Sequence, residues 1–397
     1  MPAPLRTSPV APRPLHIVFV MANNTTAPYF TWFAQAACAE PRVRMTFVAL
    51  TEESPQMKED VGRYGWACHW IPFRQSHRKT DMLRAVPRLV RLFGKLRPDI
   101  VQTHLFDDSL PGLLAARLAG VPLRMITKGD TGYHWRYTPR WMWFDKLNNA
   151  NATHVLALST ESREFILQHE QAPPEKVHVM PHGIPEWRIG QVQPEAQARL
   201  ADRLHTHGRK VVGIISRYIE WKGYGQLIPA FARLQREVPE AYLLITGYGT
   251  PVQTQAVQQL LADNGLTENE ACITGWVDPL EVPSLFALMD VYVHAATLEP
   301  FGLVIAEAMF FARPLVSTRT GCASDAVTHL QTGYLCKPGS IEELYEGMKW
   351  CIDNPTEARA MGQRAQEYAR KELTFDRCFQ RHLDLWLGAA RERRLIP

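Results

Sequence analysis

The chain has 397 residues, which is too long for one ordinary hydrophobic core and predicts two domains of roughly 150–200 residues each. Its composition is that of a globular protein, and its formal net charge of +4 is too small to indicate nucleic-acid binding. The seven cysteines are scattered and never spaced Cys-x-x-Cys, which argues against a disulfide framework and a zinc site. We therefore predict reduced thiols, no metal-binding residues and a cytoplasmic protein.

The N-terminal residues 1–14 are rich in proline and are expected to form a disordered tail. The apolar run Leu15–Ala22 is too short to span a membrane and lacks a signal-peptide cleavage region, so we interpret it as the first strand. No later segment reaches membrane-spanning length, so the sequence predicts no integral membrane segment.

Short apolar runs alternate with helical segments through the first half of the chain. This alternation is typical of βαβ units and predicts a mostly parallel sheet. The predicted strands are His16–Met21, Met45–Leu50, His69–Phe73, Asp99–Leu105, Arg124–Thr127, His154–Leu158 and Val177–Pro181.

The segment 78–97 has an amphipathic and strongly basic helical pattern, although Pro87 fits a helix only if the helix begins near it. Such a helix either covers a sheet with a solvated basic side or lies on anionic lipid. An aromatic cluster at 134–144 either packs between domains or touches the same lipid interface. The apolar face consists of Met82, Val86, Leu89, Phe93 and Leu96, and the cations are Arg84, Arg88, Arg91 and Lys95.

A stretch with Pro185, Gly190 and Pro194 interrupts this rhythm, and we place the domain boundary there. The rhythm then restarts, so a second α/β domain follows and a cleft is expected between the two. The predicted organisation is an N-terminal domain at 15–185, a linker at 186–207, a C-terminal domain at 208–375, and a helix at 376–397 that crosses back to the first domain. The strands predicted in the second domain are Val211–Ser216, Tyr242–Thr246, Cys272–Thr274, Val291–His294 and Leu315–Ser317.

The stretch Glu299–Met309 carries the strongest functional signal. A buried strand ends before it, Pro300 and Gly302 indicate a tight turn, and a helix is predicted over Leu303–Phe311. A helix N-terminus exposes unpaired N–H groups and the positive end of the macrodipole, and glycine lets an anion approach the backbone. This geometry predicts a phosphate-binding site.

Two carboxylates bracket that site, Glu299 before the turn and Glu307 about one turn into the helix. Carboxylates accept two hydrogen bonds well and suit paired sugar hydroxyls, whereas the alternative is an acidic turn that only caps the helix. Arg217 and Lys222 lie in the loop that follows the first strand of the second domain, and Gly223 ends this loop. They suit a diphosphate, with two solvated surface cations as the alternative.

Two further turns belong to this half of the chain, one with Gly247 and Gly249 and one with Gly275-Trp276-Val277. A lone Gly-x-Gly is a weak signal whose alternative is an ordinary turn. The spacing differs from a dinucleotide fingerprint and the sequence has no Gly-Lys-Ser/Thr phosphate loop. The phosphate is therefore not bound as in a kinase, an ATPase or a dehydrogenase.

Taken in order, these motifs resemble the nucleotide-binding half of the family-4 glycosyltransferases, which are retaining enzymes with two Rossmann-like domains facing across a cleft (GT-B type). The resemblance covers most of residues 205–370, and its Glu-Pro-Phe-Gly and Glu-Ala-Met core is specific. The first half matches more weakly, through Arg97–His104 and Ala115–Pro122. The motifs are Arg217, Lys222-Gly223, Gly247-x-Gly249, Gly275-Trp276-Val277, Glu299–Gly302, Glu307–Met309, Arg313-Pro314 and Gly333.

The resemblance implies that cations hold the diphosphate of a nucleotide sugar, that Glu307 binds the ribose and that Glu299 binds the donor hexose. Negative charge that grows on the leaving diphosphate would be stabilised by those cations and by the helix dipole. No Asp-x-Asp occurs where a metal would bridge the diphosphate, which agrees with a metal-independent enzyme without a cofactor. The implied donor-binding residues are Arg217, Lys222, Gly247, Gly249, Trp276, Val277, Glu299, Gly302, Leu303 and Glu307, and the candidate catalytic residues are Glu299, Arg217, Lys222 and His104.

The acceptor side departs from the family pattern. Asn23–Thr26 stands where the family often has a glycine pair. Many members carry a histidine after the strand that ends here at Thr127, and Lys128 or Asp130 takes that position in this chain. His104 is the other candidate to line the cleft, with a histidine hydrogen-bonded at a strand end as the alternative.

The sequence is thus interpreted as a retaining hexosyltransferase that moves a sugar from a UDP- or GDP-linked donor to a glycan or lipid-linked acceptor. Family habit favours cell-envelope polysaccharide or lipopolysaccharide synthesis in the cytoplasm, with contact to an anionic membrane face as a hypothesis. The alternatives are a nucleotide-sugar epimerase or hydrolase of the same architecture and a non-catalytic nucleotide-sugar-binding scaffold.

Overall fold

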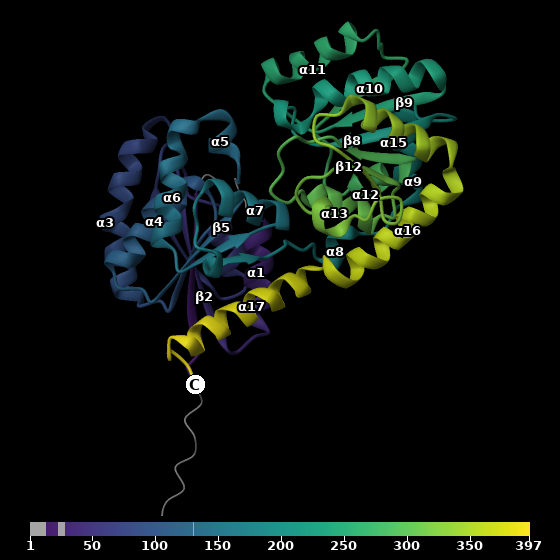
Figure 1. Ribbon diagram of the computed structural model, residues 1–397. Coiled ribbons are helices and arrows are strands. Elements are labelled where there is room, and N and C mark those ends of the chain that lie inside the picture. Colours follow the sequence, from purple (N-terminus) through teal and green to yellow (C-terminus); the bar gives the residue numbers. More distant parts are fainter. Residues whose placement is uncertain (1–12, 23–27, 130) are drawn as a thin grey trace, which may run out of the picture.

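The computed structural model describes residues 13–22, 28–129 and 131–397. Most of the predicted tail at 1–14 lies outside these ranges. Arg13 is described, and its guanidinium donates two hydrogen bonds to Asp99 at 2.8 and 2.7 Å. Figure 1 shows two α/β domains with a long C-terminal helix running from the second to the first.

The N-terminal domain is built on a parallel sheet with the strand order β3-β2-β1-β4-β5-β6-β7. Strand β1 is buried along its whole length because helices cover both faces of the sheet, as is usual for parallel sheets. The strands are β1 Leu15–Ala22, β2 Val43–Thr51, β3 Ala67–Pro72, β4 Ile100–Thr103, β5 Leu123–Lys128, β6 His154–Ala157 and β7 Val177–Val179. Every strand predicted in this half is present.

The helices of this domain complete hydrophobic clusters on both faces of the sheet. The helices are α1 Pro28–Cys38, α2 Met57–Gly62, α3 Arg78–Leu96, α4 Phe106–Leu118, α5 Tyr133–Tyr137, α6 Met142–Asn151 and α7 Thr160–His169. Short 3₁₀ turns lie at η1 Gln75–His77, η2 Pro139–Trp141 and η3 Pro174–Lys176.

Helix α3 covers the sheet rather than presenting an apolar face to the outside. Met82, Leu89 and Phe93 are buried in the core that α3 shares with α4, while its cations stay on the solvent side. The helix therefore covers the sheet with a solvated basic side, which is one of the two predicted alternatives, and contact of that basic side with anionic lipid stays a prediction. Pro87 also lies inside the helix and not at its start.

The C-terminal domain repeats the architecture with a parallel sheet in the order β10-β9-β8-β11-β12-β13. The strands are β8 Lys210–Ile215, β9 Ala241–Thr246, β10 Ala271–Gly275, β11 Val291–His294, β12 Leu315–Thr318 and β13 Tyr334–Cys336. The helices are α10 Tyr224–Glu237, α11 Pro251–Asp263, α12 Val282–Leu288, α13 Leu303–Phe310, α14 Ala323–Ala326, α15 Ile341–Asp353 and α16 Pro355–Glu372, with η4 at Glu220–Lys222. Strand β13 was not predicted from the sequence.

The predicted linker at 186–207 is largely helical. It forms α8 Glu186–Ile189 and α9 Pro194–Arg203, and Leu200, Ala201 and Leu204 are buried. Leu200 and Leu204 join the core of the second domain, so α9 belongs structurally to that domain.

The last helix, α17 Phe375–Glu392, returns to the first domain as predicted. Its buried face completes the core beside β1 and α1, and Trp386 Nε1 donates to Gln102 Oε1 at 3.0 Å. In the part of the chain that the structure describes, we find no helix with both the length and the apolar character needed to cross a membrane.

Candidate active site

The N-terminus of α13 lies directly after the loop that follows β11. Gly302 is its N-cap, with φ of 82°, a left-handed conformation that glycine adopts without strain. A Cβ at this position would lie 2.8 Å from Ile305 Cδ1 and 3.1 Å from Glu299 Cγ. The helix therefore begins on bare backbone beside the Glu299 side chain, as the phosphate-binding geometry requires.

Glu299 is held by two cationic or potentially cationic side chains. Its carboxylate pairs with the Lys222 ammonium, and its Oε2 lies 3.5 Å from His294 Nε2. Only 10% of the Glu299 side chain is exposed. Burial raises the pKa of Glu299, but His294 and Lys222 outweigh burial and lower this pKa to about 2. Glu299 is thus an ionised, oriented acceptor at neutral pH.

Lys222 reaches Glu299 because two loops are locked together. A Cβ at Gly223 would collide with the backbone carbonyl of Ala295, and Thr297 N donates to Trp221 O at 2.8 Å. Arg217, the other predicted cation, is exposed at the end of β8, and within the described ranges no side-chain partner is recorded for its guanidinium. The structure therefore joins Lys222 to Glu299 and leaves Arg217 open to solvent.

Glu307 lies in the second turn of α13, and 13% of its side chain is exposed. Arg188 on α8 donates from Nε to Glu307 Oε1 at 3.2 Å. Burial raises the pKa of Glu307, and Arg188 offsets part of that rise. Neither Arg188 nor His294 was predicted as a site residue.

The two glycine turns lie next to each other at the ends of β9 and β10. Gly247 N donates to Gly275 O at 3.1 Å, and a Cβ at Gly247 would collide with the Ser216 carbonyl. Beyond this contact, Trp276 is 64% exposed and Val277 is half-buried. These turns provide an exposed aromatic surface beside the loop of Arg217.

On the N-terminal side, His104 is packed into the domain. It is buried against Phe19 and Phe30, with ring centroids 4.7 and 4.6 Å away, and its Nδ1 donates to Val20 O at 3.2 Å. Burial lowers the pKa of His104 to about 3, so the ring is neutral. This is the hydrogen-bonded strand-end position named as the alternative.

Lys128 is also turned inward and forms ion pairs with Asp145 at 2.8 Å and Glu170 at 3.0 Å. It does not present a cation to solvent. Asp130 and Asn23–Thr26 lie outside the described residues. Within the described ranges, no three histidine, cysteine or acidic side chains are grouped as metal ligands would be.

The first domain contacts the second on both sides of the Glu299 turn. At the start of α7, Ser162 Oγ donates to Pro300 O at 3.3 Å and Gly321 N donates to Glu161 Oε2 at 2.8 Å. At α5, Tyr137 packs on Trp221 with ring centroids 5.3 Å apart. The turn is therefore enclosed between the two domains.

Comparison with known proteins places both halves in described families. The model "Glycosyl transferases group 1" matches residues 197–368, and the model "Glycosyl transferase 4-like domain" matches residues 25–183. Alpha-D-kanosaminyltransferase from Streptomyces kanamyceticus is 26% identical over 261 residues, which is 64% of this chain and 67% of that protein.

Two further proteins match over a larger share of the chain. GDP-mannose-dependent alpha-(1-6)-phosphatidylinositol monomannoside mannosyltransferase from Mycobacterium tuberculosis is 26% identical over 340 residues, which is 83% of this chain and 86% of that protein. The crystal structure of Anabaena HepE in complex with UDP superposes with a TM-score of 0.78 at 22% identity, covering 94% of this chain and 100% of that one. At this identity the superposition shows the same fold.

Proposed function

We propose a specific reaction for this chain, which belongs to glycosyltransferase family 4, also described as glycosyl transferases group 1, and has the GT-B fold. The chain is a retaining, metal-independent hexosyltransferase. The donor is a UDP- or GDP-linked hexose, and the acceptor is a glycan or a lipid-linked acceptor in cell-envelope polysaccharide or lipopolysaccharide synthesis. Similar proteins support these classes, since HepE was solved with UDP and the mycobacterial protein is a GDP-mannose-dependent phosphatidylinositol monomannoside mannosyltransferase. Retention and metal independence are carried over from the family resemblance.

The observation that carries the proposal is the arrangement of Lys222, Glu299 and Glu307 around the start of α13. An ammonium has three N–H donors, so Lys222 can keep its bond to Glu299 and still donate to a phosphate oxygen. Glu299 then accepts from hexose hydroxyls and Glu307 from ribose hydroxyls. Arg217 supplies a second cation from the exposed end of β8.

These groups stabilise the charge that develops during transfer. When the bond between the anomeric carbon and the leaving oxygen breaks, negative charge accumulates on the diphosphate. Lys222 and the N–H groups at Gly302 and Leu303 are fixed donors for that charge, so they stabilise the transition state more than water does, and Arg217 adds a cation from the exposed end of β8. His104 is buried and neutral, and we assign it no proton transfer.

The first test is thermal-shift binding of UDP, GDP, ADP and their sugar conjugates with and without EDTA, because a ligand that binds the native state raises its melting temperature. Stabilisation that survives EDTA supports the metal-independent site. Donor consumption that needs no acceptor would indicate the hydrolase or epimerase alternative, and binding without turnover would indicate the scaffold.

Glu307→Ala tests the ribose assignment. The variant loses hydrogen bonds to a charged group, each worth about 1.5–3 kcal/mol, so nucleotide affinity should fall roughly tenfold to a hundredfold. Glu281→Ala on the exposed rim of α12, which pairs with Arg203, is the matched control and should bind like the wild type. Unchanged affinity in Glu307→Ala would contradict the assignment.

We further propose that the N-terminal domain contacts anionic lipid through an aromatic–basic surface, defined as Lys79, Arg140, Trp141 and Trp143. Trp143 is 51% exposed, and the cations of Lys79 and Arg140 lie 5.4 and 5.8 Å from the centroid of the Trp141 ring. Indole rings favour the headgroup region, and each nearby cation adds about 1 kcal/mol of attraction to an anionic surface.

Vesicle sedimentation tests this surface. The wild type should bind phosphatidylglycerol vesicles and not phosphatidylcholine vesicles, and the double variant Trp143→Ser/Arg140→Gln should lose at least tenfold in binding. Arg88→Gln on the solvent side of α3 is the control for charge alone. If the α3 variant loses as much binding as the double variant, the contact is generally electrostatic and does not use this surface.

A further inference from the structure

A cation from the interdomain connection reaches the proposed ribose carboxylate. Arg188 lies on α8. This helix follows the point where the two chain segments that join the domains pair, Ile184 with Thr374. Arg188 Nε donates to Glu307 Oε1 at 3.2 Å. The sequence places these two residues 119 positions apart, so only the folded connection brings them together.

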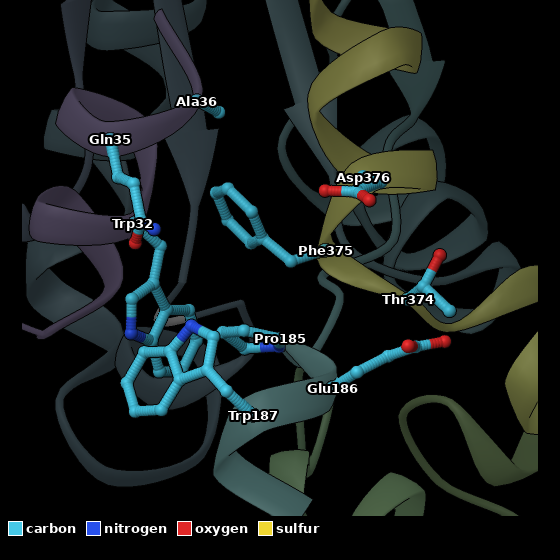
Figure 2. A pocket seen from close by; sticks show the side chains of 9 residues that line it. All are labelled: Trp32, Gln35, Ala36, Pro185, Glu186, Trp187, Thr374, Phe375 and Asp376. Atoms are coloured by element: carbon cyan, nitrogen blue, oxygen red, sulfur yellow. The ribbon is translucent and has the colours of Figure 1, made fainter. Parts of the chain in front are cut away.

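The same guanidinium also faces the first domain. The Arg188 guanidinium carbon lies 5.7 Å from the centroid of the Trp32 ring, and Trp32 on α1 is buried. Trp187 packs edge-on against Trp32 with centroids 6.4 Å apart. Figure 2 shows both indoles beside Pro185 and Phe375, where they line a cavity of about 340 Å³ at the connection.

The backbone on the N-terminal side of α8 leaves little freedom to its position. Ile184 N donates to Leu373 O at 2.9 Å, and Phe375 N donates to Ile184 O at 3.0 Å. A Cβ at Gly183 would collide with the Thr374 carbonyl, so the two connecting segments are in direct backbone contact. Arg188 therefore projects toward Glu307 from an anchored element.

We propose that Arg188 is a positioning residue of the donor site, which orients the Glu307 carboxylate and favours its ionised form for the ribose hydroxyls. This inference rests on the proposed function, since it needs Glu307 to bind ribose. Arg188 acts through Glu307 and also couples that carboxylate to Trp32 of the other domain.

The protonation state of Glu307 determines which hydrogen bonds it can form with ribose. With Arg188 bonded to Oε1, the ionised group keeps its other acceptor sites for two ribose hydroxyls, whereas a protonated carboxyl gives up an acceptor and adds a donor. Burial raises the pKa of Glu307 and Arg188 opposes that rise. The Tyr292 phenol on β11 also lies near Glu307, but burial raises its own pKa well above 10, so it is neutral.

The proposed role makes nucleotide affinity depend on pH. Nucleotide affinity requires ionised Glu307, so it falls as the pH falls through the pKa of this carboxyl. Removing Arg188 raises that pKa further, so the loss of affinity begins at a higher pH in the variant. A residue that only supports the fold would not change the pH at which half of the nucleotide affinity is lost, which is the pH midpoint of binding.

The experiment measures the dissociation constant of UDP, GDP and ADP from pH 5.5 to 8.5 for the wild type, Arg188→Gln, Arg188→Lys and Glu307→Gln. Arg188→Gln should bind about tenfold more weakly at neutral pH, because a charged hydrogen bond is lost, and its affinity should begin to fall at a higher pH. Arg188→Lys should restore the pH midpoint of the wild type in part. Glu307→Gln should bind weakly with little dependence on pH.

Arg203→Gln is the matched control, because Arg203 on neighbouring α9 forms an ion pair with Glu281 at the same distance of 3.2 Å but away from Glu307. It should behave like the wild type.

Wild-type affinity and midpoint in Arg188→Gln overturn the inference while the proposed function stands. Absence of nucleotide binding by the wild type overturns the proposed function and this inference with it. If Arg188→Gln fails to fold, the test is made with Arg188→Lys. A pH midpoint of nucleotide binding in Arg188→Lys below that of the wild type would contradict the positioning role of Arg188.

Discussion

Lys128 at the end of β5 carries its charge inside the N-terminal domain, with only 2% of its side chain exposed. Asp145 and Glu170 both pair with its ammonium, and His134 Nδ1 lies 2.7 Å from Asp145 Oδ2. Burial raises the pKa of Asp145, but Lys128 and His134 outweigh burial and lower it. A charge at this depth is tolerated because its partners are charged and hydrogen-bonded.

We predict that Lys128→Met strongly destabilises the domain. The methionine fills a similar volume, but Asp145 and Glu170 lose their cation and remain in a poorly solvated site. Removing one partner of a buried ion pair costs about 3–5 kcal/mol, which lowers the melting temperature by roughly 6–20 °C in a domain of this size. Thermal denaturation followed by circular dichroism measures the change.

Lys146→Met is the control for this prediction, since Lys146 is exposed on the same helix as Asp145 and should shift stability by no more than about 0.5 kcal/mol. A Lys128→Met protein as stable as this control would show that the buried network is not required for stability.

Residues of the site differ in how far the sequence alone could predict them. Glu299 and Glu307 follow from one short stretch in which turn, helix start and acidic side chains occur in order. Arg188 and His294 could not be found this way, because a single arginine on a linker and a histidine ending a strand have no local signature. Lys128 stood at a predicted position, but its partners on α6 and at the end of α7 turn it inward.

At the scale of elements, the start of α7 is where the two domains meet beside the Glu299 turn. Thr160 N donates to Asp325 Oδ2 and Gly321 N to Glu161 Oε2, both at 2.8 Å. Burial, together with the nearby charges of Asp325 and Glu299, raises the pKa of Glu161 to about 7, and the Gly321 hydrogen bond only partly opposes this. The contact therefore places a carboxyl group where its ionised form is disfavoured.

We predict that Glu161→Gln stabilises the protein at high pH and not at low pH. A carboxyl group whose pKa rises on folding binds more protons in the folded state, so the wild type loses stability as the pH rises from about 4.5 to 7. The glutamine amide still accepts from Gly321 N but has no charge. Its melting temperature should exceed that of the wild type by a few degrees at pH 8 and match it at pH 4.5.

Glu175→Gln, an exposed position in η3 of the same domain, is the control and should show no pH-dependent difference from the wild type. An equal gain at both pH values would mean that the stabilisation comes from side-chain packing rather than from the charge of Glu161.

Elements with long apolar runs were predictable, and those defined by prolines were not. Central strands such as β1 and β9 were predictable because a strand buried on both faces needs a continuous apolar run. Strand β13 was not predicted, but the predicted β7 is equally short at three residues, so length alone does not explain the difference. Pro185 and Pro194 indicated a break in the sequence, but they stand at the N-cap of α8 and at the first turn of α9, where proline is well tolerated.

At the scale of the whole molecule, two connections set the relation between the domains. One runs through Gly183 and Ile184 into α8, and the other runs through Thr374 into α17. They meet at a crossing between the domains, where Ile184 and Thr374 form a parallel β-bridge. The sequence predicted both domains and the returning helix, because each has its own apolar pattern. It did not predict the crossing, because this contact joins residues nearly 200 positions apart and depends on the absence of a side chain at Gly183.

We predict that Gly183→Ala reduces turnover much more than nucleotide binding. The new Cβ would lie 2.8 Å from Phe375 Cα and 2.6 Å from the Thr374 carbonyl carbon, whereas ordinary contacts begin near 3.4 Å. Because both neighbours are backbone atoms, the connecting segments must separate and the domains must shift. Lys222, Glu299 and Glu307 all belong to the second domain and move together, so nucleotide affinity should fall by no more than the roughly tenfold loss expected when the Arg188–Glu307 pair is lost. The acceptor side moves relative to them, and a displacement of about 1 Å at a reacting centre costs on the order of 10²-fold in rate.

The measurement compares release of nucleotide from the sugar donor with nucleotide affinity for the wild type, Gly183→Ala and Gly388→Ala. Gly388 lies in α17 with open space around the site of a Cβ, so alanine there should preserve turnover and leave the crossing unchanged. If Gly183→Ala turned over like Gly388→Ala, the position of the domains would be set by the α7 and α5 contacts rather than by the crossing. If affinity and turnover fell together, the strain would extend through α8 to Arg188 and Glu307, and the second domain would not move as one body.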